Sequence, residues 1–349
     1  MKSTVKYIMT LFIGAALFSS CKKTIDLDPT HTINGQDFFK TIDEYDYVLT
    51  GTYQRLKLNG LYSGVNGGSI FLSAVDIAGD NFYNGPDNLG SLNTAFRWNY
   101  TADNNSVQAA WDNAYQVIQH TNLSVRGIDR FAATDGLKVN RIEGQARALR
   151  AFMHFELLRW WATNYDRNST ALGIPYVDKF DIEQMPARPT VKETYDKIEA
   201  DLKTAHAMLS NTDKPVQSAT STAGSARAYI DTLVCDAMLA RMYLYANELD
   251  SAIKYSTRVI NARPLASPDV FPSIWQDAST AEVVWSIKYQ SSEAPLAREV
   301  YQTAGNLISW QPVDDLLGLY DPGDVRGDIT LLMLTEPLFW VNTQPKHLH

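Results

Sequence analysis

The sequence predicts a mainly α protein, in which successive helices form a scaffold and long irregular loops connect them. Apolar residues recur at the three- and four-residue spacings of a helix face through much of residues 45–209. A candidate helix pair follows at 225–264. Between the helices, residues 59–101 combine many Gly and Asn residues with several aromatic ones, which is typical of ordered, functional loops.

Length, composition and charge narrow the class of protein. The chain has 349 residues, of which 45% are hydrophobic, so it can bury a substantial core. No Pro-, Gly- and Ser-rich linker divides it, and we expect one domain at 41–349. The formal charge is −8, with acidic and basic residues interspersed. Because a nucleic-acid surface is a basic patch or stripe, this distribution argues against a nucleic-acid partner.

The first twenty residues have the layout of a secretory signal. Lys2 and Lys6 precede an apolar run at 7–18 that is too short to span a bilayer, and small residues then lead to Cys21. We expect 1–20 to be a lipoprotein signal peptide and Cys21 to become a lipidated N-terminus anchored in a membrane. Residues 21–40 would then be a tether, and secretion without a lipid is the alternative.

The helices can be placed from the periodicity. It predicts helices that include residues 45–56, 111–125 and 142–160. Thr190 and Glu193 form a T-x-x-E capping box, which marks the start of a fourth helix whose apolar stripe ends at residue 209. Beyond residue 265 the pattern is irregular, and 283–289 is the one segment that we expect to be a short strand.

Residues 225–264 match part of the tetratricopeptide pattern. Ala240 and Ala252 stand where small residues let two helices approach closely, and Pro264 stands at the closing proline. Asp236 departs from the pattern, which has Trp there. We expect a helix hairpin with its turn at 247–250.

The usual catalytic motifs are absent from the sequence, which contains no G-x-S-x-G, H-E-x-x-H, C-x-x-C or P-loop pattern. We predict no catalytic residue, no metal and no cofactor. His154 and Cys235 lie in apolar helical stretches and are expected to be core residues. A glycosidase would need two carboxylates facing one cleft. The loop candidates are Asp76, Asp80, Asp314 and Asp315, for which solvated loop and cap positions are the alternative interpretation.

Aromatic loop residues are the better candidates for a binding site. Sugar rings have apolar C–H faces edged by hydroxyl groups, so aromatic rings stack on them while amides bind the hydroxyls. The candidate ligand-binding residues are Asn81, Tyr83, Trp98, Tyr289 and Trp310. For each ring, packing of the loop onto the core is the alternative.

Several motifs in order resemble the SusD/RagB family of Bacteroidetes outer-membrane lipoproteins. Residues 144–158 resemble the family's G-E-A-x-x-x-R-A-x-x-x-F-x-L helix, with Gln145 in place of Glu. The G-x-P motif follows at 173–175, the R-x-[ST]-V-x-E-x-Y motif starts at Arg188, and 237–244 resemble A-L-L-A-R-V-Y-L. The resemblance ends near residue 326, where members of the family continue, so we expect a chain truncated at its C-terminus.

The resemblance implies a tetratricopeptide-like helical-repeat scaffold whose long irregular loops build the ligand face. It also implies a nutrient-binding lipoprotein of the cell outer membrane, lipid-anchored and exposed at the surface. Such a protein delivers oligosaccharide to a SusC-like TonB-dependent transporter. The alternatives are a tetratricopeptide-type scaffold that binds only protein, and a surface glycosidase.

Overall fold

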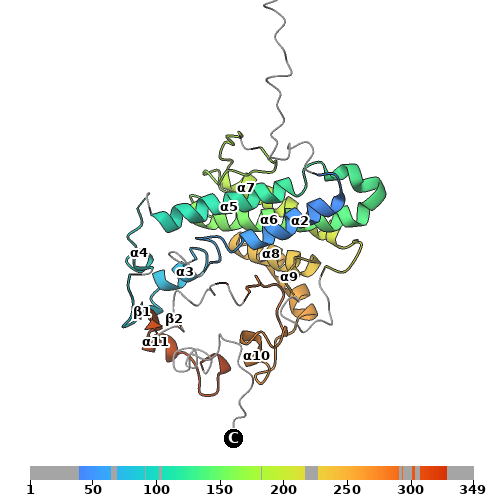
Figure 1. Cartoon of the computed structure of the whole chain (residues 1–349). Coiled ribbons are helices and arrows are strands. Elements are labelled where there is room, and N and C mark those ends of the chain that lie inside the picture. Colours follow the sequence, from blue (N-terminus) through green and yellow to red (C-terminus); the bar gives the residue numbers. More distant parts are fainter. Residues whose placement is uncertain are drawn as a thin grey trace, which may run out of the picture. The chain divides into compact units, whose positions relative to one another are not determined.

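The computed structural model describes residues 39–63, 69–90, 92–101, 104–181, 183–216, 227–290, 293, 301–302 and 307–327. The chain divides into two units, 1–41 and 42–349, and the second contains the helices and strands discussed below (Figure 1). The predicted signal peptide, Cys21 and nearly all of the tether lie outside the described residues. Within the described part of the chain, none of the helices has the length and apolar composition needed to cross a bilayer.

Four long helices form the main layer of this unit (Figure 1). α2 (Ile42–Arg55), α5 (Asn105–Leu123) and α6 (Ala132–Trp161) pack against one another, and α7 (Val191–Leu209) packs along α6. The 3-10 helix η2 (Ile128–Phe131) lies between α5 and α6 in the chain. The mainly α fold predicted from the periodicity is confirmed.

α6 is the central helix of the layer. Almost every side chain from Gly144 to Leu158 is buried, so this part of α6 has no solvent-exposed face. Its contact with α7 is close, because a Cβ atom placed on Gly144 would lie 2.8 Å from Cγ of Leu209 and 3.3 Å from the carbonyl oxygen of Ala205. The family-like motif at 144–158 is therefore a packing motif at the centre of the core.

The predicted helix hairpin is confirmed. α8 (Thr232–Tyr245) and α9 (Leu249–Ala262) pack along each other, and α8 also packs against α7. Asn247 forms the turn with φ of 56°, a left-handed conformation that Asn tolerates better than most residues. Ala252 is buried at the contact between the two helices, as the small-residue position in the pattern predicts.

The helix starts are fixed by side-chain caps. The Thr190–Glu193 capping box is formed: the Glu193 amide donates to the Thr190 hydroxyl at 3.1 Å, and the Thr190 amide donates to the Glu193 carboxylate at 2.8 Å. Asn104 accepts from the amide of Val107 and starts α5 several residues before the predicted position. Asp231 caps α8 in the same way.

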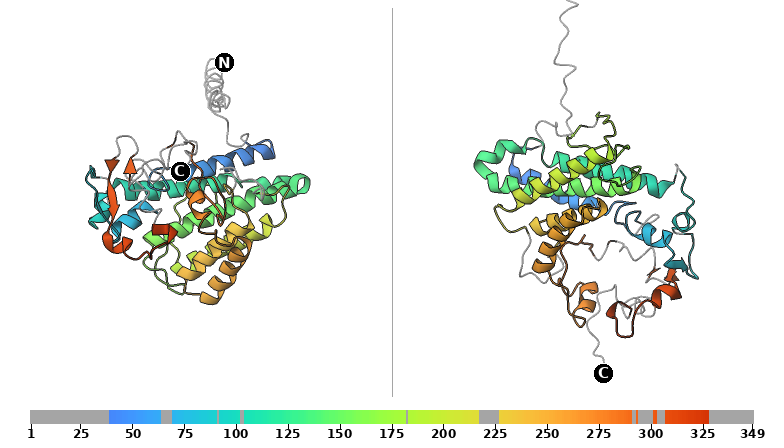
Figure 2. Two further views of the ribbon diagram at one scale, coloured as in Figure 1. Left: turned by 90° about the horizontal axis from the view of Figure 1, so that it is seen from below. Right: turned by 180° about the vertical axis from the view of Figure 1, so that it is seen from behind.

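The described parts of the loops contain only short elements. These are α3 (Ser73–Ala78), β1 (Phe82–Asn84), α4 (Asn93–Phe96), α10 (Phe271–Trp275), β2 (Tyr301–Gln302), β3 (Leu307–Ile308), β4 (Trp310–Pro312) and α11 (Asp314–Leu317). β1 pairs antiparallel with β4, with Tyr83 opposite Gln311, and β2 pairs antiparallel with β3. Figures 1 and 2 agree that α3, α4, β1 and α11 lie side by side.

The predicted strand at 283–289 is wrong. The segment is extended, but among the described residues it has no partner strand. It is held instead by single contacts: the Ser286 amide donates to the carbonyl of Arg227 at 2.9 Å, and the Trp285 indole donates to the carbonyl of Ala228 at 3.1 Å. The apolar residues that suggested a strand pack on the core, with the Trp285 ring against Phe152.

Candidate functional site

Four of the five predicted ligand-binding residues lie in one group of loops, built by α3, β1, α4 and β4. We call the described residues of 73–98 and 307–317 the loop cluster. Backbone hydrogen bonds join its two segments, from the Val313 amide to the Asn81 carbonyl at 2.9 Å and from the Gly85 amide to the Ser309 carbonyl at 2.8 Å. A Cβ atom on Gly85 would lie 2.3 Å from the carbonyl oxygen of Ile308, so only glycine permits this approach.

Trp98 presents an exposed aromatic ring on the loop cluster. Its surface is 73% exposed, and its indole N–H donates to the carbonyl of Ala78 at the end of α3, at 2.8 Å. Its backbone has φ of 53°, a left-handed conformation that is costly for a bulky residue. Because strained backbone conformations cluster at functional sites, Trp98 stays a candidate for ligand contact.

Tyr83 and Asn81 lie near the pairing of β1 with β4. The Tyr83 ring is 45% exposed, and the Asn81 side chain is also exposed. The main-chain carbonyl of Asn81 accepts the Val313 hydrogen bond, so the backbone of Asn81 is fixed while its side-chain amide faces solvent. The structure therefore brings two exposed rings and an exposed amide into one loop cluster.

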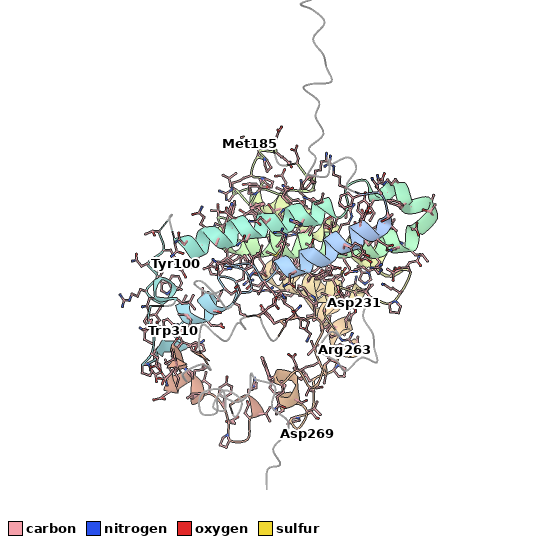
Figure 3. The ribbon with its side chains drawn as sticks, in the orientation of Figure 1. Tyr100, Met185, Asp231, Arg263, Asp269 and Trp310 are labelled. Carbon is pink, nitrogen blue, oxygen red and sulfur yellow. The ribbon has the colours of Figure 1, made fainter. Side chains whose placement is uncertain are left out.

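Trp310 corrects one part of the predicted site. The residue is fully buried, and its ring packs on Phe96 with centroids 5.1 Å apart. Figure 3 shows Trp310 among the side chains of the loop cluster. Because the ring is enclosed and packs on Phe96, the structure agrees with the alternative for Trp310, in which the ring packs its loop onto the core.

Tyr289 lies apart from the loop cluster as we define it. Its hydroxyl donates to the carbonyl of Tyr62, and the ammonium group of Lys57 lies 5.4 Å from the centre of its ring. Burial raises the pKa of the Tyr289 hydroxyl. Tyr289 is half-buried, and its contacts are with Tyr62 and Lys57 in the segment that follows α2. Its contact with a ligand stays a prediction.

An aromatic group at the C-terminal end of α6 was not predicted from the sequence. Trp161 packs on Trp111 of α5 at 5.4 Å between centroids and on Phe71 at 6.2 Å, and Trp160 lies 6.5 Å from Phe71. Both tryptophans of α6 are half-buried. Helical spacing assigned Trp111 and Trp160 to helix faces, but it could not show that the loop residue Phe71 would join them.

Two of the titratable groups are core residues, as predicted, whereas neither Asp76 nor Asp314 makes a side-chain cap hydrogen bond. His154 and Cys235 are buried, and burial raises the pKa of the Cys235 thiol. Asp76 lies in the first turn of α3, where burial raises its pKa, and Asp314 lies in the first turn of α11. In the described residues, no group of three or more His, Cys, Asp or Glu side chains is arranged to hold a metal ion.

Comparison with known proteins supports the resemblance found in the motifs. Residues 48–244 match the model of a SusD-like family described as starch-binding and associating with the outer membrane. The SusD-like protein P38 of Formosa agariphila is 23% identical over 262 residues, which are 72% of this chain and 44% of that protein. The chain thus spans less than half the length of this relative.

Two solved structures share the fold. A SusD superfamily protein from Bacteroides thetaiotaomicron superposes with a TM-score of 0.67 at 23% identity, over 82% of this chain and 63% of that one. Surface glycan-binding protein A from the same species, in complex with laminarihexaose, superposes with a TM-score of 0.63 at 14% identity, over 82% of this chain and 62% of that one. The family model covers more than half of the sequence, and the chain therefore belongs to the SusD-like family.

Proposed function

We propose that this chain is a surface lipoprotein of the outer membrane that binds an oligosaccharide and catalyses no reaction. The observation that carries the proposal is the ring of Trp98, 73% exposed and fixed by its hydrogen bond to Ala78. The family description and the glycan complex of the structural relative support a sugar as the ligand. Cys21 would carry the lipid that anchors the protein.

The loop cluster suits a sugar because it combines stacking surfaces with hydrogen-bonding groups. The rings of Trp98 and Tyr83 would cover the apolar faces of sugar rings, and the Asn81 amide would bind hydroxyls at their edges. The Trp98 ring needs little reordering on binding, since its indole N–H is already engaged. We place the primary contact at Trp98.

Trp98→Ala is expected to weaken oligosaccharide binding by roughly 10- to 50-fold, because covering one face of the ring contributes about 2 kcal/mol. Native affinity gels with a polysaccharide panel would identify the ligand, and calorimetry would give the affinities. Tyr47→Ala is the matched control, since Tyr47 is also 73% exposed but lies on α2. Wild-type affinity in a folded Trp98→Ala protein would remove Trp98 from the site.

The same samples separate the alternative functions. A reducing-sugar assay on retarded polysaccharides is expected to show no release, whereas a glycosidase would release sugar. A scaffold that binds only protein would be retarded by no glycan.

Contact with a protein partner is favoured by one observation on α9. Three apolar side chains of this helix are each more than half exposed: Leu249, Ile253 and Ile260. We assign the SusC-like transporter as that partner, which is compatible with sugar binding at the loop cluster.

A further inference from the structure

Arg227 is a buried cation that forms no ion pair with any residue of the described chain. Only 5% of its surface is exposed, and among the described residues its Nε atom has no hydrogen-bond partner. The other buried arginines of the described chain are paired: Arg141 holds Asp46 and Asp213, and Arg150 holds Asp201. Because buried charges are normally compensated, Arg227 is the exception that calls for an explanation.

A second enclosed polar atom lies on the segment next to Arg227. The amide of Ser286 donates to the carbonyl of Arg227 at 2.9 Å, which brings the two backbones together. The Ser286 hydroxyl oxygen is enclosed and, within the described residues, has no hydrogen-bond partner. A guanidinium and a hydroxyl are both donors. Two unsatisfied donors on adjoining segments are suited to one acceptor that carries negative charge.

The carboxylates that lie near Arg227 or Ser286 in the sequence have other partners, and none of them forms a described ion pair with Arg227. Asp231 caps α8, Asp277 pairs with Lys288, Glu282 accepts the amide of Ala266, and Glu293 pairs with Lys57. The sequence at 217–226, which leads into Arg227, contains no Asp or Glu. Arg227 also has φ of 76°, so a strained backbone holds this cation in place.

We propose that Arg227 and Ser286 bind an anionic group of the glycan, either the carboxylate of a uronic acid or a sulfate ester. The proposal rests on the proposed glycan-binding function and narrows its ligand to an acidic oligosaccharide. The guanidinium fork matches the paired oxygens of a carboxylate or sulfate, and the hydroxyl supplies a further donor. Tyr289, a predicted ligand-binding residue, lies on the same extended segment as Ser286.

The test uses two pairs of polysaccharides that differ in charge. Polygalacturonate is compared with its methyl ester, and dextran sulfate with dextran, on affinity gels and by calorimetry at one salt concentration. The wild-type protein is expected to prefer an acidic member, and the preferred pair distinguishes a carboxylate from a sulfate. Arg227→Met should weaken binding of that member by about 10- to 100-fold, and Ser286→Ala by less. Arg227→Lys should retain part of the affinity.

Arg263→Met is the control, because Arg263 caps the C-terminal end of α9 and lies on neither of the two segments that carry Arg227 and Ser286. It is expected to bind as the wild type does. Arg227→Met should unfold at the same or a higher temperature, since it removes an uncompensated buried charge. Wild-type preference for the neutral members, or unchanged acidic binding by Arg227→Met, would overturn the inference while glycan binding stands. Failure to bind any glycan would overturn the proposed function as well.

Discussion

Arg150 and Asp201 form an ion pair in the centre of the helical core. Two hydrogen bonds of 2.7 Å join the guanidinium of α6 to the carboxylate of α7, and the Tyr176 hydroxyl donates to the same carboxylate at 2.6 Å. Burial alone would raise the pKa of Asp201, but the hydrogen bonds and charge of Arg150 outweigh it and lower the pKa. The pair therefore stays ionised inside the core and fixes how α6 and α7 meet.

His154 is neutral because both ring nitrogens are engaged in the core. The Val177 amide donates to Nε2 at 3.0 Å, so Nε2 must be an acceptor, and Nδ1–H donates to the carbonyl of Arg150 at 2.8 Å. Burial is the main reason that its pKa falls from 6.5 to about 3. A proton on Nε2 would break the bond from Val177.

We predict that His154 makes the free energy of unfolding depend on pH between about 6.5 and 3. Its contribution is fully present above 6.5 and is lost as the pH falls, because the unfolded chain then binds a proton that the folded chain excludes. The loss should approach about 1.4 kcal/mol per pH unit. Urea unfolding of the wild type and His154→Gln from pH 7.5 to 4.5 would measure it. The gap between the two should narrow at low pH, and parallel curves would contradict the prediction.

The packing of α6 on α7 depends on one glycine. Gly144→Ala would place a Cβ atom 2.8 Å from Cγ of Leu209, so we expect a loss of about 1–3 kcal/mol in the free energy of unfolding. Gly51→Ala in α2 is the control, because no heavy atom lies within 4 Å of the added carbon. It should stabilise the protein by about 0.5–1 kcal/mol through helix propensity. Urea denaturation gives both values, and equal effects would show that the close approach is unimportant.

At the scale of elements, predictions that depend on residues close in sequence were correct. The prediction of a strand, which depends on a distant partner strand, was wrong. The Thr190 cap and the α8–α9 hairpin depend on residues close in sequence, and both were predicted. The strand at 283–289 was mispredicted because a strand needs a partner, whereas the Trp285 indole binds the carbonyl of Ala228 instead. The start of α5 was missed because Asn104 extends the helix beyond its apolar stripe.

In the molecule as a whole, the loop cluster depends on contacts between distant parts of the chain. β1 pairs with β4, and the buried ring of Trp310 in β4 packs on Phe96 of α4. We predict that Trp310→Ala loosens this cluster while α6 and α7 keep their packing, since the cavity would lie far from their contact.

Hydrogen exchange followed by mass spectrometry would test this prediction. Faster exchange is expected at residues 82–87 and 307–313, with α6 unchanged, and oligosaccharide affinity should fall although Trp310 is buried. Equal acceleration across the whole chain would show that the loop cluster unfolds only together with the helices. A glycan ligand is expected to slow exchange at the same segments in the wild type.

The sequence by itself determined the helical scaffold, the Thr190–Glu193 cap of α7, the burial of His154 and Cys235, and the family. These follow from periodicity and motifs, which depend on residues within a few turns of one another. Only the tertiary structure decided that Asn81, Tyr83 and Trp98 share one loop cluster. It also decided that Trp310 is buried within that cluster and that the backbones of Arg227 and Ser286 meet. Whether an aromatic ring is exposed or a cation is unpaired depends on neighbours brought from distant segments, and local sequence does not encode those neighbours.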